Sequence, residues 1–449
     1  MTMRKSALRI CRFIVSNFKS IGEPGIDLEL KPLTLLFGPQ GAGKSNILEA
    51  FWRFARLLYE TVVRSSYGEM QYLAHIEPRY SNLKSIFHKE DPHRLLKIGT
   101  FVPIEEGKIG GWVIGFREEF KENELVAFEE VVLNGEVVLK LGRIAKGQGT
   151  HQLIVLTPER LRHLSVVSKR WPPATRPEVF ELANVPEELI KSSRHARYIA
   201  SAIVKSLVGK RVTKVAFLTA LRGQIHEEVS TDEYVEDDGE VYPLKPDGSN
   251  LIPYLSFILN SSRYMKYADF MRRWAKELGL DNLMAGFWGR HRLSADFRDN
   301  ILNVAVKLAH ASHGARQALC VIAQLFSPTQ EIILIEEPEI SLHPESVVKL
   351  PLMFLDAIEM GKQIIITTHS TILPLALSKM VKEARERGLC EDPNELIAVY
   401  EIWKDEEGTK AERYLLDERG YIKGYVKSFW IVEEELLKEW EEKLPEVPT

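Results

Sequence analysis

Residues 38–45 read Gly38-Pro39-Gln40-Gly41-Ala42-Gly43-Lys44-Ser45 and fit the G-x-x-x-x-G-K-[ST] pattern that cradles nucleotide phosphates. The apolar run 33–37 before this loop suits a buried parallel strand, and apolar residues at helical spacing follow it to about Arg64. A strand, a glycine loop and a helix start together direct backbone N–H groups and the positive end of a helix dipole towards an anion. The alternative is a Gly-rich turn that arose by chance, but such a turn needs neither a strand before it nor a helix after it. The stretch therefore predicts a bound nucleoside triphosphate.

The residues of this loop have separate expected roles. The glycines let the chain wrap the phosphates with positive φ angles and leave no Cβ atoms in the way. Lys44 would reach the β- and γ-phosphates, and the Ser45 hydroxyl would hold Mg²⁺. The expected cofactors are therefore ATP and Mg²⁺, and the expected binding residues are Gly38, Pro39, Gln40, Gly41, Ala42, Gly43, Lys44, Ser45 and Asn46.

A second motif lies about three hundred residues later, where the apolar run 332–335 ends in Glu336 and Glu337. A buried parallel strand of this kind places both acids at its carboxyl end, where α/β sheets bind ligands. Glu336 would coordinate Mg²⁺ directly or through water, and Glu337 would orient or deprotonate the attacking water. A solvated acidic turn is the commoner fate of a Glu-Glu pair, but the phosphate-binding loop upstream favours the catalytic interpretation.

Two further segments complete the predicted site. His369 follows another apolar strand, 363–368, and could donate a hydrogen bond to the γ-phosphate, although a lone histidine is more often structural. Ser312 and Gly314 precede a helix expected over 315–325, which makes a second helix N-terminus able to bind an anion. Two anion-binding helix termini of one subunit are difficult to place around a single phosphate chain. Both can be used if Ser312 and Gly314 contact nucleotide that is held by another subunit. Taken alone, Ser-x-Gly before a helix is usually only a cap.

The composition limits the class of protein. Net charge is −4, which gives no global electrostatic case for nucleic acid, so any basic surface must be local. The three cysteines are far apart, form no metal-ligand pattern and suit reduced thiols of a cytoplasmic protein. No uncharged stretch reaches the length of about 18 residues that a membrane helix needs. The expectation is a soluble, cytoplasmic protein with no membrane partner.

Three regions are expected along the chain. Residues 1–157 would hold the phosphate-binding loop and an antiparallel β meander, in which Asn134-Gly135 is the pair preferred by a type I′ hairpin turn. Residues 158–300 are expected to be a mostly helical insertion, and residues 301–449 return to α/β alternation. Between positions 159 and 222 there are 13 Lys/Arg and 5 Asp/Glu, followed by an acidic run in 223–240. The basic candidates for phosphate-backbone contact are Arg160, Arg162, Lys169, Arg170, Lys210, Arg211 and Lys214, and a solvated helical face explains them equally well.

In this order, the motifs resemble those of the ABC-type ATPases: Walker A loop, signature, Walker B strand and switch histidine. Asn17-Phe18-Lys19-Ser20 resembles the N-F-K-S opening of the SMC, RecF and OLD branch, which lies near the nucleotide base, so Lys19 is expected to contact the nucleotide. Glu336–Pro344 is similar to the E-E-P-E-x-x-L-H-P of the AAA-15/AAA-21 group of predicted ATPases. The segments 80–91, 221–222 and 414–430 also resemble that group.

The resemblance implies an α/β fold of the P-loop NTPase class. Its form is the ABC-ATPase, SMC head-like type, with a mixed central sheet, an antiparallel β meander and a helical insertion. The chain departs from the family where Glu336 replaces an aspartate and where Ala311 and His313 alter the signature. Gln71 is the candidate for the Q-loop. Only about eighty residues follow His369 and they carry no convincing Toprim acids, so the chain is not expected to be a nuclease.

These features bear on three classes of function. The first is an ATP-gated homodimer in DNA maintenance or phage defence, in which one γ-phosphate joins Lys44 of one subunit and Ser312 of the other. The second is an ATPase regulatory subunit that controls a separately encoded effector, such as a nuclease or toxin, with no direct DNA role. The third, a transporter ATPase, is disfavoured because 267 residues separate Ser45 from Ser312, a far longer interval than transporters have.

Overall fold

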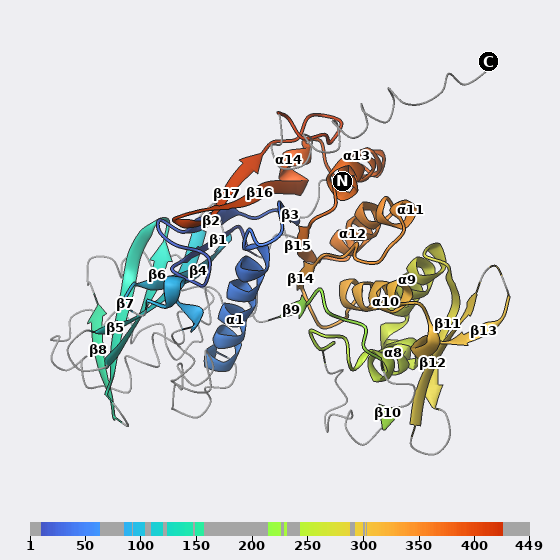
Figure 1. Ribbon diagram of the computed structural model, residues 1–449, viewed down its shortest axis with the longest axis horizontal. Helices are drawn as coiled ribbons and strands as arrows, with labels where there is room; N and C mark the ends of the chain where they lie inside the picture. The colour runs from blue at the N-terminus through green and yellow to red at the C-terminus, as the bar shows by residue number, and fades with distance from the viewer. Residues whose placement is uncertain are drawn as a thin grey trace, which may run out of the picture.

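A six-stranded mixed sheet forms the centre of the computed structural model, in the order β17-β16-β3-β15-β14-β9 (Figure 1). Its strands are β3 (Leu33–Phe37), β9 (Val215–Leu218), β14 (Ile332–Glu336), β15 (Gln363–Thr368), β16 (Ile397–Asp405) and β17 (Gly408–Tyr414). All neighbours pair in parallel except β16 and β17, so β3, β9, β14 and β15 end at the same edge. The structure describes residues 10–62, 85–91, 93–103, 109–119, 124–146, 149–156, 214–225, 229–230, 243–287, 292–299, 301 and 303–424.

Helices cover both faces of this sheet, as its apolar strands require. Leu33, Leu35 and Ile333 belong to the core cluster that includes α10 (His313–Leu325) and α12 (Leu350–Glu359). α1 (Lys44–Val62) covers the opposite face, where Trp52 lies against Phe217 of β9 with ring centroids 5.6 Å apart. The remaining helices of this part are α11 (Pro344–Val347), α13 (Ile372–Glu386) and α14 (Pro393–Leu396).

A seven-stranded antiparallel sheet lies beside α1 in the order β2-β1-β4-β5-β6-β7-β8, which confirms the predicted meander (Figure 1). Asn134 and Gly135 connect two of its strands with φ angles of 50° and 84°, as a type I′ turn requires. The strands are β1 (Arg12–Ser16), β2 (Ile26–Glu29), β4 (Leu96–Pro103), β5 (Ile109–Glu119), β6 (Glu124–Leu133), β7 (Glu136–Lys146) and β8 (Gly149–Leu156).

The structure describes only part of the region 158–300, which was expected to be a mostly helical insertion, and this part contains both helices and strands. Within it, β9 belongs to the central sheet, and α8 (Leu251–Asn260) and α9 (Met265–Glu277) pack on a separate antiparallel sheet. Residues 280–285 form a strand and do not extend helix α9. Gly279, with φ 87°, ends that helix and allows the chain to turn into the strand. The strands of this sheet are β10 (Val229–Ser230), β11 (Leu280–Phe287), β12 (Arg292–Asp299) and β13 (Ala305–Lys307).

Much of the basic segment lies outside the described residues. Among its named candidates the structure describes only Lys214, whose Nζ lies 3.2 Å from Oε1 of Glu331. The acidic run 223–240 is likewise described only at 223–225 and 229–230, and Gln71 is not described. In the part of the chain that the structure describes, no helix combines the length and apolar character needed to cross a membrane.

Asp356 of α12 joins three helices of the second half of the chain. Its carboxylate is buried and accepts hydrogen bonds from Nε1 of Trp274, at 2.8 Å, and from Nη1 of Arg387, at 2.8 Å. The Arg273 guanidinium also pairs with it. A buried carboxylate needs such partners to offset its lost hydration, so this cluster fixes α9 and α13 against α12.

Candidate active site

The phosphate-binding loop connects β3 to α1 and encloses the amine of Lys44. Lys44 Nζ donates to the carbonyl oxygens of Gly38, at 2.8 Å, and Pro39, at 2.9 Å. Lys44 is 4% exposed, and no carboxylate oxygen of the described residues lies at ion-pair distance from its amine. Burial therefore lowers the pKa of Lys44 to about 8, while the negative charges of Glu337 and Glu339 act in the opposite direction. A phosphate would supply the counterion that this buried amine lacks.

The glycines of the loop have the conformations that their pattern predicts. Gly38, Gly41 and Gly43 have φ angles of 145°, 76° and 100°. A Cβ at Gly43 would lie 2.2 Å from Oγ1 of Thr409 and 2.5 Å from Oγ of Ser20, whereas one at Gly41 would meet nothing within 4 Å. Gly43 is therefore required by close packing behind the loop, and Gly41 by its backbone conformation alone.

The N-F-K-S segment and β17 form this backing. Ser20 Oγ lies 2.7 Å from Thr409 Oγ1 and accepts a hydrogen bond from Nδ2 of Asn46, also at 2.7 Å. Lys19, with φ 50°, forms an ion pair with Glu49 of α1. Asn46 and Lys19 were predicted to bind the cofactor, and the structure places both beside the loop, with Lys19 tied to the helix that starts there.

Glu337 and His369 meet at the carboxyl edge next to Lys44. His369 Nδ1 lies 3.3 Å from Lys44 Nζ, and His369 Nε2 lies 3.4 Å from Oε1 of Glu337. Because an ammonium group only donates, Nδ1 accepts and Nε2 carries the proton that faces the carboxylate. Burial and the neighbouring Lys44 charge lower the pKa of His369, so the imidazole is neutral at pH 7. The two residues predicted from separate strand ends thus lie together beside the loop lysine, with His369 between Lys44 and Glu337.

Glu336 has a different environment from Glu337. Its Oε2 accepts a hydrogen bond from the backbone N–H of Ala220 at 3.0 Å, which leaves Oε1 for a metal ion or a bridging water. Ser45, the other expected Mg²⁺ ligand, is exposed at the first turn of α1. Within the described residues no cluster of three or more His, Cys, Asp or Glu side chains could hold a metal alone. The donor set fits an ion that is coordinated largely by nucleotide phosphates, as Mg²⁺ commonly is.

The signature segment caps its helix as expected. Ser312 is the N-cap of α10 and its side chain accepts from the backbone N–H of Ala315 at 3.2 Å. A Cβ at Gly314 would lie 2.4 Å from the carbonyl oxygen of Ser341, so this glycine lets α10 approach the turn that follows Glu337. Action of Ser312 and Gly314 on a second subunit's nucleotide stays a prediction.

Two site residues had no role assigned from sequence. Glu339 accepts from the backbone N–H of His369 at 3.2 Å and from the Thr368 hydroxyl, and burial raises its pKa. Arg222, noted only as part of a family-like segment, is 1% exposed and donates to the backbone carbonyls of Glu336 and Glu337. The E-P-E spacing could have indicated Glu339, because it lies two residues beyond the predicted catalytic acid.

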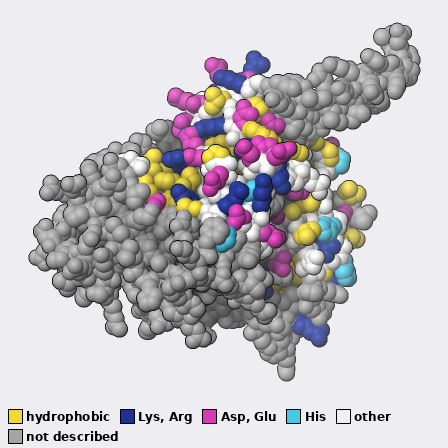
Figure 2. Space-filling model, turned by 60° about the vertical axis from the view of Figure 1, so that its left-hand side comes forward, with side chains coloured by type: hydrophobic (Ala, Val, Ile, Leu, Met, Phe, Trp, Pro, Cys, Tyr) yellow, Lys and Arg dark blue, Asp and Glu magenta, His cyan; other side chains and the backbone are white. Residues whose placement is uncertain are grey.

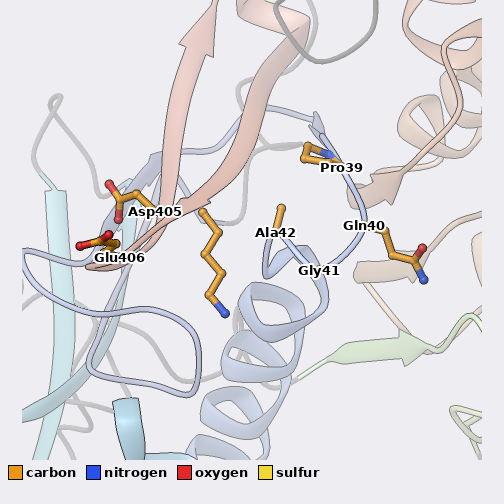
Figure 3. Close-up of a pocket in the computed structure, with 7 residues that line it drawn as sticks. Pro39, Gln40, Gly41, Ala42, Asp405 and Glu406 are labelled. Atoms are coloured by element: carbon orange, nitrogen blue, oxygen red, sulfur yellow. The ribbon is translucent and has the colours of Figure 1, made fainter. Parts of the chain in front are cut away.

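A hollow of ≈ 540 Å³ lies between the phosphate-binding loop and the β16–β17 turn (Figure 3). Asp405 in that turn accepts from the backbone N–H groups of Glu407, at 2.9 Å, and Gly408, at 3.0 Å. The volume lies in the range of small-molecule sites, and the hollow is lined by Pro39, Gln40, Gly41, Ala42, Lys404, Asp405 and Glu406.

Comparison with protein families identifies the two segments that build this site. Residues 12–90 match an AAA domain model, and residues 232–376 match a model described as "AAA domain, putative AbiEii toxin, Type IV TA system". Two segments of the chain are thus similar to AAA-type ATPase domains. The two AAA segments carry the phosphate-binding loop in one and Ser312, Glu336, Glu337 and His369 in the other. They confirm the predicted resemblance to this ATPase group and indicate nucleotide hydrolysis.

Solved structures with a similar chain path include three SMC head domains. The Pyrococcus furiosus head with an extended coiled coil, bound to the C-terminal domain of ScpA, is 12% identical with a TM-score of 0.41, covering 96% of this chain and 98% of that one. The Pyrococcus yayanosii head with a coiled coil and joint is 11% identical, with a TM-score of 0.41 and coverage of 96% and 99%. The Thermotoga maritima head is 12% identical, with a TM-score of 0.36 and coverage of 90% and 99%. No curated protein matches the chain.

Proposed function

We propose that this protein is a Mg²⁺-dependent ATPase that works as an ATP-gated homodimer in DNA maintenance or phage defence. The observation that carries the ATPase part is the meeting of Lys44, His369 and Glu337 at one edge of the sheet. Lys44 begins α1 after the loop that follows β3, whereas His369 and Glu337 directly follow β15 and β14. Together they combine a phosphate-binding cation with a carboxylate that can receive a proton from water.

Each residue of the site then has a defined role. Lys44 leaves the carbonyl oxygens of its own loop to bind the β- and γ-phosphates, whose charge restores its full protonation. Glu337 orients the attacking water, and His369, with its proton on Nε2, senses the γ-phosphate. Mg²⁺, held by Ser45 and Glu336, supplies charge neutralisation to the phosphates when bound.

Two variants test the chemistry. Lys44→Ala should lose nucleotide binding, and unchanged ATP affinity would contradict the phosphate-loop assignment. Glu337→Gln should bind ATP and fail to hydrolyse it; normal turnover would transfer the water-activating role to another group. Glu345→Gln, at an exposed position of the same chain segment, is the matched control and should hydrolyse ATP like the wild-type protein.

The homodimer rests on the two helix N-termini that would share one nucleotide, at Lys44 and at Ser312 of a second copy. ATP would join two copies, and hydrolysis would release them, in the manner of a γ-phosphate that orders an interface. Light scattering of Glu337→Gln should show a dimer with ATP and a monomer with ADP. A monomer under both conditions would contradict the gating mechanism.

The proposed DNA role is supported by the sequence alone. It depends on the basic segment 159–222, and most of the Lys and Arg residues named there as candidates for DNA contact lie outside the described residues. On the described part of the face in Figure 2, acidic and basic side chains are interspersed rather than gathered by sign. Turnover should therefore be measured with and without duplex DNA at two salt concentrations, with Glu337→Gln as the blank. Salt-sensitive stimulation by DNA supports this role.

Control of a separately encoded effector is the second candidate function. The model that matches residues 232–376 is described as a putative toxin of a toxin–antitoxin system, which supports a function alongside a second, separately encoded component. This candidate predicts ATP turnover that is indifferent to duplex DNA at both salt concentrations.

A further inference from the structure

Arg222 is the most deeply buried charged side chain beside the candidate active site, and it lies on the loop that follows β9. Its guanidinium donates from Nη1 to the carbonyl oxygens of Thr219, at 2.9 Å, and Glu336, at 2.6 Å, and from Nη2 to that of Glu337, at 2.8 Å. No carboxylate oxygen of the described residues forms an ion pair with it, and burial lowers the pKa of Arg222 to about 10. Because the guanidinium is planar and its N–H groups have fixed directions, donation to the carbonyls of Glu336 and Glu337 holds the turn that contains these two residues in place.

The turn that Arg222 holds has an unfavourable conformation. Glu337 has a φ of 43°, in the left-handed region that residues other than glycine rarely adopt. Its backbone N–H donates to the carbonyl of Thr367 in β15 at 3.0 Å, and its own carbonyl receives the Arg222 guanidinium. Glu337 is therefore fixed from both sides, and this backbone conformation directs its carboxylate to His369.

The other side of the Arg222 loop is fixed on α10. Gly223, with φ 79°, comes so close to this helix that a Cβ would lie 3.3 Å from the backbone of Arg316 and Gln317. Cys320 of α10 is buried and close enough to interact electrostatically with Arg222. The guanidinium thus spans the space between the signature helix and the Walker B turn.

We propose that Arg222 is a positioning residue for ATP hydrolysis: it holds the Glu336–Glu337 turn so that the Glu337 carboxylate reaches the attacking water. This inference rests on the proposed ATPase function, because it assigns Glu337 the water-activating role. Arg222 is 1% exposed and its guanidinium donates to backbone carbonyls, so its loss should affect the chemical step and leave nucleotide binding at Lys44 intact.

The test uses Arg222→Lys in the full chain. Lysine keeps the positive charge and three N–H donors but lacks the planar fork that reaches both glutamate carbonyls. We expect kcat to fall by about 10- to 100-fold, the scale of a misplaced catalytic group, with KM and the affinity for a fluorescent ATP analogue within about twofold of wild type. Leu221→Ala is the matched control, since Leu221 is 83% exposed in the same loop and should leave both constants unchanged.

A double-mutant comparison separates positioning from general stability. Glu337→Gln is expected to retain only a slow residual hydrolysis, which can be followed over long incubations with the protein in excess of ATP. If Arg222 acts through Glu337, Arg222→Lys should change this residual single-turnover rate by less than about twofold in the Glu337→Gln background. An equal fall in both backgrounds, or wild-type kcat in Arg222→Lys, would overturn the inference while leaving the ATPase assignment standing.

If Arg222→Lys does not fold, Arg222→Gln is measured in the same way. Failure of both to fold would make Arg222 a general structural residue. Wild-type turnover no greater than that of Glu337→Gln would overturn the proposed function itself.

Discussion

The buried amine of Lys44 makes ATP affinity depend on pH in a direction that can be calculated. Burial lowers the pKa of Lys44 from 10.5 to about 8 in the free protein, which corresponds to about 3 kcal/mol against the charged form. Phosphates in the loop would raise the pKa again, because they stabilise the ammonium. As pH rises through 8, the free protein loses the proton first, and ATP must recapture it on binding. Affinity therefore falls with rising pH.

The size of the effect follows from this pKa alone. With the complex still protonated, the apparent Kd rises by about twofold between pH 7 and pH 8 and by about tenfold between pH 7 and pH 9. His369 does not contribute, because its pKa is lowered from 6.5 and the ring stays neutral across this window. Calorimetry in two buffers with different ionisation enthalpies should show uptake of about half a proton per ATP bound at pH 8.

Fluorescence titration with an ATP analogue from pH 7 to 9 is the direct assay. Lys44→Arg is the control, since a guanidinium stays protonated throughout and should give a flat profile whatever its affinity. A flat profile in the wild-type protein would refute the reasoning from burial. An equal slope in Lys44→Arg would assign the titration to some other group.

Two further predictions concern the stability of the fold. Gly43→Ala should lower the free energy of unfolding by about 2 to 4 kcal/mol, because its Cβ meets Thr409, while Gly41→Ala should cost about 1 kcal/mol from backbone strain alone; urea unfolding that gives equal losses would contradict the close packing. Asp356→Ala should destabilise the protein by about 3 kcal/mol, since it leaves the Trp274 N–H and two arginines without their shared acceptor. A loss below about 1 kcal/mol in the same measurement would show that solvent replaces this acceptor.

Several parts of the site could be predicted because their signals are local in the chain. The run 33–37, the glycine loop and the helix start are adjacent, so a short window specifies the β3–loop–α1 unit and the position of Lys44 at the start of the helix. The same holds for the apolar strands that end at Glu336 and Thr368. Local periodicity is misleading at residues 280–285: the spacing of apolar residues over 250–285 predicts helix, but residues 280–285 belong to β11.

By itself, the sequence determined that an apolar strand, a glycine loop and a helix would form a phosphate site, and that acidic and histidine residues would end two other strands. Only the tertiary structure decided which strands are neighbours. β15 lies between β3 and β14 and brings His369 within 3.3 Å of Lys44, although 325 positions separate them. β9 pairs with β14 and thereby delivers Arg222 to the Glu337 carbonyl. Buried parallel strands are all short apolar runs, so their patterns carry no information about their order. That order is set by how the helices pack on both faces of the sheet.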